Sequence, residues 1–200
     1  NIPADPESLS LEALKNGDKT EFARLVNQYS SKIYRLALRI LNDPQQAEDV
    51  LQETFLKAFR SIGSFEGRSS VSTWLYRIAA NEALMIIRRR KPETALVDEK
   101  DQDDDEATDE TIVTDWCCMP EEELLTNESR KFMNEAIQKL SPALRVVFMM
   151  RDIDGLSIKE TADALDLSEA AVKTRLLRAR LSLREQLSKY YHEMHPDVRE

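Results

Sequence analysis

Apolar residues recur at helical spacing in the first ninety residues of the chain. Asp18 with Glu21 has the form of a capping box, in which two residues three apart satisfy the free N–H groups that begin a helix. The apolar positions that follow form one helical stripe, made of Phe22, Leu25, Val26, Tyr29, Ile33, Leu36, Ala37 and Ile40. This pattern predicts a long amphipathic helix that ends before Asp43.

The same logic predicts two more helices before residue 92. Asp43 followed by Pro44 indicates an N-cap and a first helical position. The next stripe ends at Gly63 and consists of Ala47, Val50, Leu51, Phe55, Ala58, Phe59 and Ile62. A short polar loop then leads to a third helix from about Val71 to Arg90, which Pro92 ends.

A second series of helices is predicted after residue 120. The first covers about Pro120 to Leu140, and Ser141 with Pro142 then opens a helix that contains Leu144, Val147, Phe148 and Arg151. Ser157 with Glu160 is another capping box, before a short helix. The turn Asp166-Leu167-Ser168 follows, and Ser168 caps a long final helix toward Tyr190.

Period-two alternation does not persist over a convincing length, so strands are not expected. We therefore predict an all-α protein with two small helical domains, at residues 8–92 and 120–191. Residues 93–119 are expected to be a flexible acidic linker, because the run DQDDDEATDE repels itself and large apolar residues are few.

The charge distribution agrees with this division of 200 residues that are 42% hydrophobic and carry a net charge of −9. Residues 1–92 hold 14 Lys and Arg against 11 Asp and Glu, a net charge of +3. Residues 93–128 hold one base and 15 acids, or −14, and residues 129–200 hold 13 bases and 11 acids, or +2. Two mildly basic blocks thus flank a very acidic stretch.

The strongest local signal is the pair of helices from Ser157 to Leu187, which has the parts of a helix-turn-helix. Ala162 is small where the two helices must cross. The second helix has a stripe expected to be buried, made of Val172, Leu176, Ala179, Leu183 and Leu187. Its remaining faces carry cations with no acid from Ala170 to Arg184, as suits a DNA major groove. A solvated basic face is the alternative.

Two further surfaces are candidates for binding. Trp74, Arg77, Asn81 and Arg88 share one face of the third helix, where aromatic, guanidinium and amide groups can stack on unpaired bases and bind their edges. The alternative is a core Trp74 and a basic helix end that complements the helix dipole. On the second helix, an acidic polar patch with one exposed Leu could dock a basic partner helix or be ordinary solvent surface; it comprises Asp49, Gln52, Glu53 and Leu56.

Catalytic chemistry is not evident in the sequence. Four scattered Gly residues cannot build a phosphate loop, and no catalytic triad or carboxylate pair stands out, so we expect a protein that is not an enzyme and has no cofactor or small-molecule substrate. Cys117 and Cys118 are adjacent, without CxxC spacing, and a zinc site with His192 and His195 is a weak alternative. A redox-sensing pair of thiols is another alternative. The simplest interpretation is that both are ordinary cysteines of the linker. No metal is therefore expected.

At this point the chain resembles a family. The stretch DPQQAEDVLQETFLKAFRSIGSFEGRSSVSTWLYRIAANEA is similar to the promoter-melting domain of bacterial sigma-70-type factors, and LSPALRVVFMMRDIDGLSIKETADALDLSEAAVKTRLLRARLSLRE to their C-terminal helix-turn-helix domain. Two such domains without a large middle domain resemble the extracytoplasmic function (ECF) sigma factors. The resemblance implies a dissociable subunit that directs core RNA polymerase to promoters and melts the DNA.

The resemblance implies a role for each surface. Asp49, Gln52, Glu53 and Leu56 would face the clamp helices of the largest polymerase subunit, and the second-largest subunit would contribute its flap. The minus-ten element, melted with a flipped base, would meet Phe65, Ser72, Thr73, Trp74, Arg77, Asn81 and Arg88. The minus-thirty-five element would meet Lys173, Thr174, Leu177 and Arg178 at base edges, with Arg175 and Arg180 nearer phosphates.

The resemblance also implies partners and a location. Promoter DNA, core RNA polymerase and an anti-sigma factor are the expected partners. The N-terminus lacks a basic start and an apolar stretch, and no apolar run approaches the roughly 20 residues of a membrane span, so a cytoplasmic protein without membrane insertion is expected. An anti-sigma factor could hold it at the inner membrane face. A stand-alone helix-turn-helix regulator and an acidic helical adaptor remain the alternatives.

Overall fold

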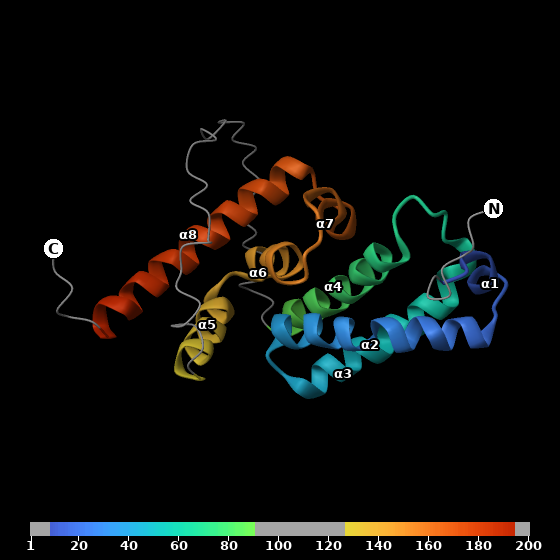
Figure 1. The fold of residues 1–200 in the computed structure, drawn as a ribbon, viewed down its shortest axis with the longest axis horizontal. Coiled ribbons are helices and arrows are strands. Elements are labelled where there is room, and N and C mark those ends of the chain that lie inside the picture. Colours follow the sequence, from blue (N-terminus) through green and yellow to red (C-terminus); the bar gives the residue numbers. More distant parts are fainter. Residues whose placement is uncertain (1–8, 91–126, 195–200) are drawn as a thin grey trace.

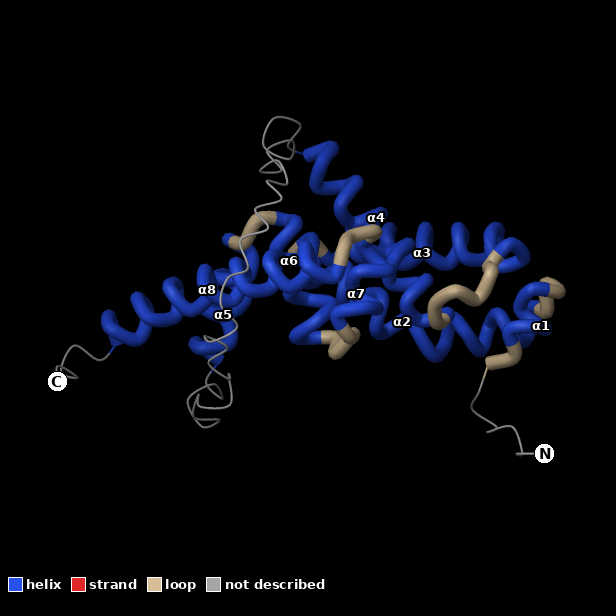
Figure 2. Tube along the Cα trace, turned by 90° about the horizontal axis from the view of Figure 1, so that it is seen from above, coloured by secondary structure: helices blue, strands red, loops and turns tan. Residues whose placement is uncertain are grey.

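The structure is a computed structural model that describes residues 9–90 and 127–194 of the chain. Every regular element in these two ranges is helical, and Figure 2 shows helices joined by short loops. The N-terminal domain contains α1 (Leu11–Lys15), α2 (Lys19–Leu41), α3 (Pro44–Ser61), the 3-10 turn η1 (Ile62–Ser64) and α4 (Val71–Arg90). The C-terminal domain contains α5 (Asn127–Lys139), α6 (Pro142–Phe148), the π-helical turn η4 (Met149–Ile153), α7 (Ile158–Leu165) and α8 (Glu169–Met194).

Caps predicted from the sequence define where helices of the N-terminal domain begin. The Asp43 side chain accepts a hydrogen bond from the Gln46 N–H at 3.1 Å, and Pro44 occupies the first turn of α3. Asp18 caps α2 by accepting from the N–H groups of Thr20 and Glu21. α2 ends at Asn42, whose left-handed backbone (φ 52°) directs its N–H to the Leu38 carbonyl at 2.8 Å.

The long helices of the N-terminal domain bury their apolar residues in a shared core. α2, α3 and α4 contact one another, as Figure 1 shows, and α1 lies against α2 and η1. The fully buried side chains of this core include Leu25, Ile33, Leu36, Ile40, Val50 and Leu75. α4 contributes small buried residues, Ala79, Ala80 and Ala83, and helix axes can approach more closely where side chains are small.

The C-terminal domain holds the predicted helix-turn-helix. Ser157 and Glu160 make both halves of the predicted capping box at the start of α7. Asp166 ends α7 in the left-handed region (φ 56°), a conformation that Asp tolerates better than most residues, and Ser168 accepts from the Ala171 N–H at 3.1 Å. The predicted stripe of α8 is buried throughout: Val172, Leu176, Ala179, Leu183 and Leu187.

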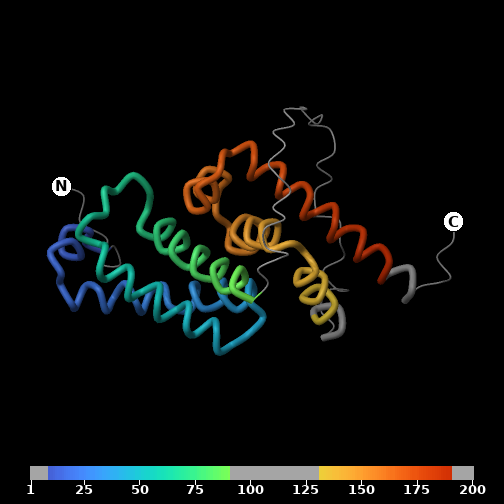
Figure 3. The backbone as a smooth tube through the Cα atoms, turned by 180° about the vertical axis from the view of Figure 1, so that it is seen from behind, coloured from blue at the N-terminus to red at the C-terminus, as the bar shows by residue number. Residues whose placement is uncertain are grey.

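The two domains pack directly against each other. α7 lies along α4, α6 touches α2 and α4, and η4 touches α2, so the joint involves two helices of the N-terminal domain. Figures 1 and 3, drawn from opposite sides, both place α7 beside α4 while α8 extends away from the N-terminal domain. The predicted linker, and the expected helical residues 120–126, lie outside the described residues.

Four details differ from the sequence-based predictions. The helix expected to contain Arg151 ends at Phe148, and Arg151 lies in the π-helical turn η4. The carboxylate of Glu21 does not complete a capping box with Asp18; it is buried, accepts from the Ser10 N–H at 2.7 Å and pairs with Arg24 at 2.8 Å. A short helix before Asp18, α1, supplies that Ser10 as its N-cap and was not predicted. Phe59, assigned to the apolar stripe of the second helix, is 46% exposed, and its ring meets that of Phe22 in an edge-to-face arrangement.

Candidate polymerase and promoter interfaces

The patch on α3 is exposed on one helical face. Asp49, Gln52 and Leu56 are exposed, Leu56 by 43%, and the Glu53 side chain is 41% exposed. Their spacing of three and four residues places them on one side of α3. Lys57 lies beside the patch and joins Glu82 of α4 at 2.5 Å and Glu53 at 3.7 Å, which ties α3 to α4.

Phe59 enlarges this α3 patch and was missed at the sequence level. It lies three residues after Leu56, and both side chains are close to half exposed. Its ring meets Phe22 edge-on with centroids 5.0 Å apart, an arrangement that holds the ring in place while leaving one side open. The helical period alone could not separate it from the neighbouring core position Phe55, because both fall near the edge of the same stripe.

The loop and helix predicted to hold the minus-ten element divide into exposed and supporting residues. Arg77, Asn81 and Arg88 are exposed on α4, and Trp74 is partly exposed. Phe65 is buried and its ring contacts that of Trp74 with centroids 5.1 Å apart. Phe65 therefore supports the indole of Trp74 from the protein interior. The sequence-based set is thus brought together, but only part of it faces solvent.

Thr73 and Ser72 occupy the start of α4. Thr73 is buried, its hydroxyl lies 2.9 Å from the Ser70 hydroxyl, and its N–H donates to the same Ser70 oxygen at 3.0 Å. Ser70 therefore caps α4 and Thr73 supports that cap, while Ser72 is half-buried. The geometry gives Thr73 a structural role at the site, and its contact with DNA stays a prediction.

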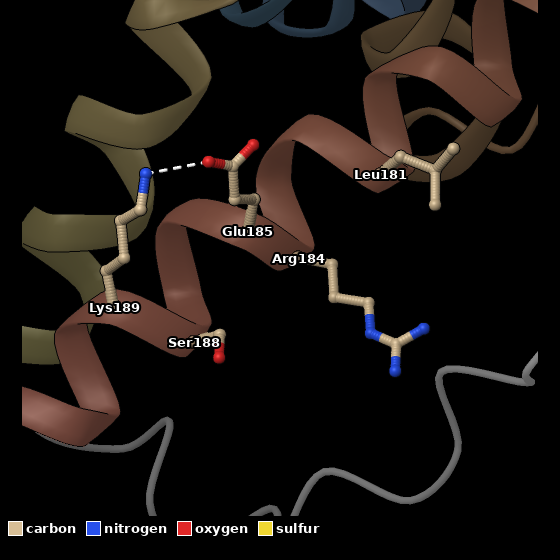
Figure 4. Close-up of a pocket in the computed structure, with 5 residues that line it drawn as sticks. All are labelled: Leu181, Arg184, Glu185, Ser188 and Lys189. Carbon is tan, nitrogen blue, oxygen red and sulfur yellow. Dashed lines mark hydrogen bonds and ion pairs between the residues drawn. The ribbon is translucent and has the colours of Figure 1, made fainter.

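Residues predicted to read the minus-thirty-five element lie on the outer face of α8. Lys173, Thr174, Leu177 and Arg178 are exposed there, and Arg175 is half-buried. Farther along, Figure 4 shows Arg184 extending away from the helix, while Glu185 and Lys189 pair with each other at 2.7 Å. The Lys189 ammonium lowers the pKa of the Glu185 carboxyl.

Arg180 has a different environment from the other cations of α8. Its Nε and Nη2 atoms bind both carboxylate oxygens of Asp152 in η4, at 2.9 and 2.8 Å. Such a bidentate pair fixes the orientation of both groups. The bond joins the recognition helix to the π-helical turn, so Arg180 has a stabilising contact within its own domain, and its predicted phosphate contact stays a prediction.

Metal and membrane sites were also considered. Over residues 9–90 and 127–194, no cluster of three or more His, Cys, Asp or Glu is arranged to hold a metal ion. Cys117, Cys118 and His195 lie outside the described residues, and so does the His192 side chain. Within the same ranges, no helix combines the length and the apolar character that crossing a bilayer requires.

The arrangement is that of a two-domain DNA-binding protein with a helix-turn-helix and a separate aromatic and basic helix face. Residues 25–93 match the family Sigma-70 region 2, and residues 133–183 match Sigma-70, region 4. The chain belongs to the ECF sigma factors of the sigma-70 family and functions as a sigma factor. The stand-alone regulator is accordingly not favoured.

Relatives match over nearly their whole length. The ECF RNA polymerase sigma factor SigW of Bacillus subtilis is 37% identical over 88% of this chain and 94% of its own. The RNA polymerase sigma-H factor of Pseudomonas aeruginosa is 34% identical over 92% of this chain and 94% of its own. The ECF sigma-E factor of Escherichia coli is 33% identical over 87% and 90%.

Solved structures share the fold. CnrH in complex with the cytosolic domain of CnrY aligns with a TM-score of 0.64 at 22% identity, over 90% of this chain and 95% of that one. The sigma factor RpoE of Bartonella quintana, in complex with the anti-sigma factor NepR, aligns with a TM-score of 0.62 at 22% identity, over 84% and 98%.

Proposed function

We propose that the three surfaces of this sigma factor divide the work of initiation. The α3 patch with Asp49, Gln52, Glu53 and Leu56 docks the clamp helices of the largest polymerase subunit, and Phe59 adds apolar area to it. This assignment is supported by exposed acids around apolar side chains, a pattern that suits a basic partner helix. The second-largest subunit contributes its flap, which contacts the C-terminal domain.

The face of α4 binds the melted minus-ten element. Trp74, held by Phe65, offers a stacking surface, while Arg77 and Asn81 offer hydrogen bonds to a base edge and a phosphate. The loop before α4, with Ser72 and its neighbours, accepts the flipped base. Arg88, toward the C-terminal end of α4, lies where it can follow the DNA backbone.

The outer face of α8 reads the minus-thirty-five element in the major groove. The single observation that carries this proposal is the intact helix-turn-helix: α7 and α8 are capped at the turn, the inner stripe of α8 is buried, and its outer face is open and basic. Lys173, Thr174, Leu177 and Arg178 reach base edges, and Arg175 and Arg180 stand nearer phosphates.

An anti-sigma factor controls the protein in this proposal. Two structural relatives are described in complexes, CnrH with CnrY and RpoE with the anti-sigma factor NepR, and this chain shares their fold. We place the function in the cytoplasm, where core polymerase works, with a membrane-bound anti-sigma factor able to hold the protein at the inner membrane face. The protein is not an enzyme and uses no cofactor.

Transcription in vitro tests the proposal. The purified chain is added to bacterial core polymerase lacking any sigma subunit, with fragmented genomic DNA, and RNA 5′ ends are mapped. New start sites that share two spaced upstream motifs are expected. Absence of new starts, together with salt-sensitive duplex binding by the chain alone, would instead indicate a plain regulator.

The Asn81→Ala variant separates the surfaces within the same assay. Loss of an amide that reads an unpaired base should impair promoter opening or the choice of minus-ten sequence, and binding to core polymerase should stay intact. Permanganate footprinting and core pull-down measure the two steps separately. Loss of core binding in this variant would mean that the α4 face has been misassigned.

A further inference from the structure

The C-terminal end of α2 is a point where the two domains exchange hydrogen bonds. Helix ends leave carbonyl groups without partners inside the helix. Here the Arg39 carbonyl accepts from Gln138 Nε2 at 2.7 Å, and the Ile40 carbonyl accepts from Arg145 Nη1 at 2.8 Å. Both donors belong to the C-terminal domain, so that domain completes the hydrogen bonding of a helix in the other.

Arg145 is fixed in place for this contact. The same guanidinium donates to Gln138 Oε1 at 2.7 Å, to the Leu140 carbonyl at 3.0 Å and to the Gln138 carbonyl. Burial lowers the pKa of Arg145 from its ordinary value. Its positive charge faces the negative end of the α2 dipole, where a cation is favourable.

A second contact lies one residue before Ile40. Arg39 Nη1 stands 3.3 Å from Oδ1 of Asp154, whose side chain is only 10% exposed. The other carboxylate oxygen of Asp154 is buried without a hydrogen-bond partner. Arg39 is therefore the hydrogen-bonding cation for a carboxylate that the closed joint removes from water, with Arg35 and Lys32 of α2 acting at longer range.

When the two domains are in contact, which we call the closed form, α4 and α8 are too close together to reach both promoter elements at once. By their names the two elements lie about 25 base pairs apart, or roughly 85 Å at 3.4 Å per step. In the closed form α6 and α7 each contact both α4 and α8, and helix axes in contact are about 10 Å apart. The 36 residues from 91 to 126 have a maximum reach of about 120 Å, so the covalent connection permits separation of the domains.

We propose that the contact of Arg39, Gln138 and Arg145 across the end of α2 is an autoinhibitory latch, which holds the two DNA-binding domains together until polymerase or promoter separates them. The inference rests on the proposed function for its biological meaning. The latch itself is a property of the free chain, since every group in it belongs to this chain. Its partner surface is the C-terminal domain of the same molecule.

Small-angle X-ray scattering of the full chain tests the latch. Arg39→Ala leaves the Asp154 carboxylate buried without its cation, a state that the molecule escapes by opening. We expect the equilibrium to shift toward the open form by about tenfold, within the range of coupling between contacting residues, with a larger radius of gyration. Arg60→Ala, which removes the same charge from an exposed site on α3, should leave the radius unchanged.

A double variant makes the test specific. Asp154→Asn removes the charge that needs Arg39, so Arg39→Ala with Asp154→Asn should restore the compact radius that Arg39→Ala loses. Gln138→Ala, which deletes the bond to the Arg39 carbonyl, should expand the chain independently. Circular dichroism accompanies each measurement, to distinguish domain opening from unfolding. If Arg39→Ala lowers the helix content, the test of the latch rests on the radii of Gln138→Ala and the double variant.

Several results would overturn the latch. A wild-type chain already as expanded as Arg39→Ala, or variants as compact as wild type, would show that these contacts do not hold the domains. Transcription with core polymerase separates the two claims. If the variants expand but neither wild type nor any variant initiates transcription, the proposed function is rejected and the latch is kept. If transcription initiates but the radii of gyration are unchanged, the latch is rejected and the proposed function is kept.

Discussion

Individual titratable residues have very different environments in this protein, and the difference decides what each can do. Tyr76 and Asp154 are the clearest examples at the joint. Burial, with the nearby Asp154 charge, raises the pKa of Tyr76 to about 12. Burial also raises the pKa of Asp154, against the opposing effects of Arg39, Arg35 and Lys32. Ionised Asp154 therefore lowers the stability of the folded protein.

The raised pKa of Asp154 gives a prediction about pH. Its stabilising contribution is fully present below its ordinary value of 3.8, where the group is protonated in both states, and is lost as the pH rises through the raised pKa of the folded protein. Asp154→Asn should therefore match wild type near pH 3.8 and be increasingly more stable above it. Urea unfolding over a pH series measures this, and a constant difference would contradict it.

Arg178 tests base reading on α8. If it makes a bidentate contact with a base, Arg178→Ala should weaken minus-thirty-five binding by about 1–3 kcal/mol and relax the preference at one position. Gel-shift titrations of polymerase holoenzyme with matched and mutated elements measure both effects. Arg184→Ala, which removes the same charge farther along α8, is the control and should not change sequence preference. An equal loss on every sequence would make Arg178 a phosphate contact.

Residue type and spacing predicted exposure well and partners less well. The polar patch on α3 and the outer face of α8 followed from helical spacing, because a stripe that packs inward leaves its opposite face in solvent. The partners of Glu21 and Arg180 could not be predicted, since Ser10 and Asp152 lie on elements that only folding brings near. Long-range pairing has no signature in local spacing.

At the scale of elements, helix boundaries follow from side-chain caps. Asp43, Ser141, Ser157 and Ser168 were each predicted as caps, and each accepts the expected backbone N–H. These residues act through bonds three positions along the chain, so the sequence contains the whole interaction. The short α1, although Ser10 caps it locally, and the π-helical turn η4 were not predicted; α1 contacts α2 and η1, and η4 contacts α2, α6 and α7.

The capping box of α7 gives a prediction at this scale. Hydrogen bonds from the Ser157 backbone and hydroxyl lower the pKa of Glu160, so its contribution is present above its ordinary value of 4.5 and lost as the pH falls through the lower value in the folded protein. Ser157→Ala should cost about 1 kcal/mol of unfolding free energy at neutral pH. Chemical denaturation measures it.

A matched substitution controls for loss of the side chain itself. Ser182→Ala replaces a half-buried serine inside α8, away from any helix start, and should have a smaller effect. If Ser157→Ala and Ser182→Ala cost the same at neutral pH, or if the cost of Ser157→Ala does not shrink in acid, the cap does not stabilise α7 in the way proposed.

For the whole molecule, the two-domain helical plan was predictable and the docking of the domains was not. Composition alone separates the basic blocks from the acidic stretch between them. The joint instead uses backbone carbonyls of α2, which every helix possesses, and small residues on α4 that resemble any other buried Ala. Neither leaves a distinctive pattern in the sequence.

The acidic stretch supports a prediction for the assembled polymerase. It lies outside the described residues, and the family resemblance implies a path through channels that otherwise hold nucleic acid, where its charge would mimic a phosphate backbone. Replacing the acids of Asp101–Glu106 with Ser should weaken core binding or initiation. Exchanging Asp and Glu at the same positions keeps the charge and is the control. Unchanged initiation with Ser would count against charge mimicry.

The position of α7 between α4 and α8 has a consequence for how such proteins diversify. The residues proposed to read bases lie on the outer face of α8, while the side chains that bond across the domains lie on α2, α5 and α6 and at Asp154, just after η4. If both proposals hold, promoter specificity and domain closure depend on different side chains. Under the proposed assignment, exchanging Lys173 and Leu177 would redirect the protein to new promoters, and each new factor would inherit the same closed resting state.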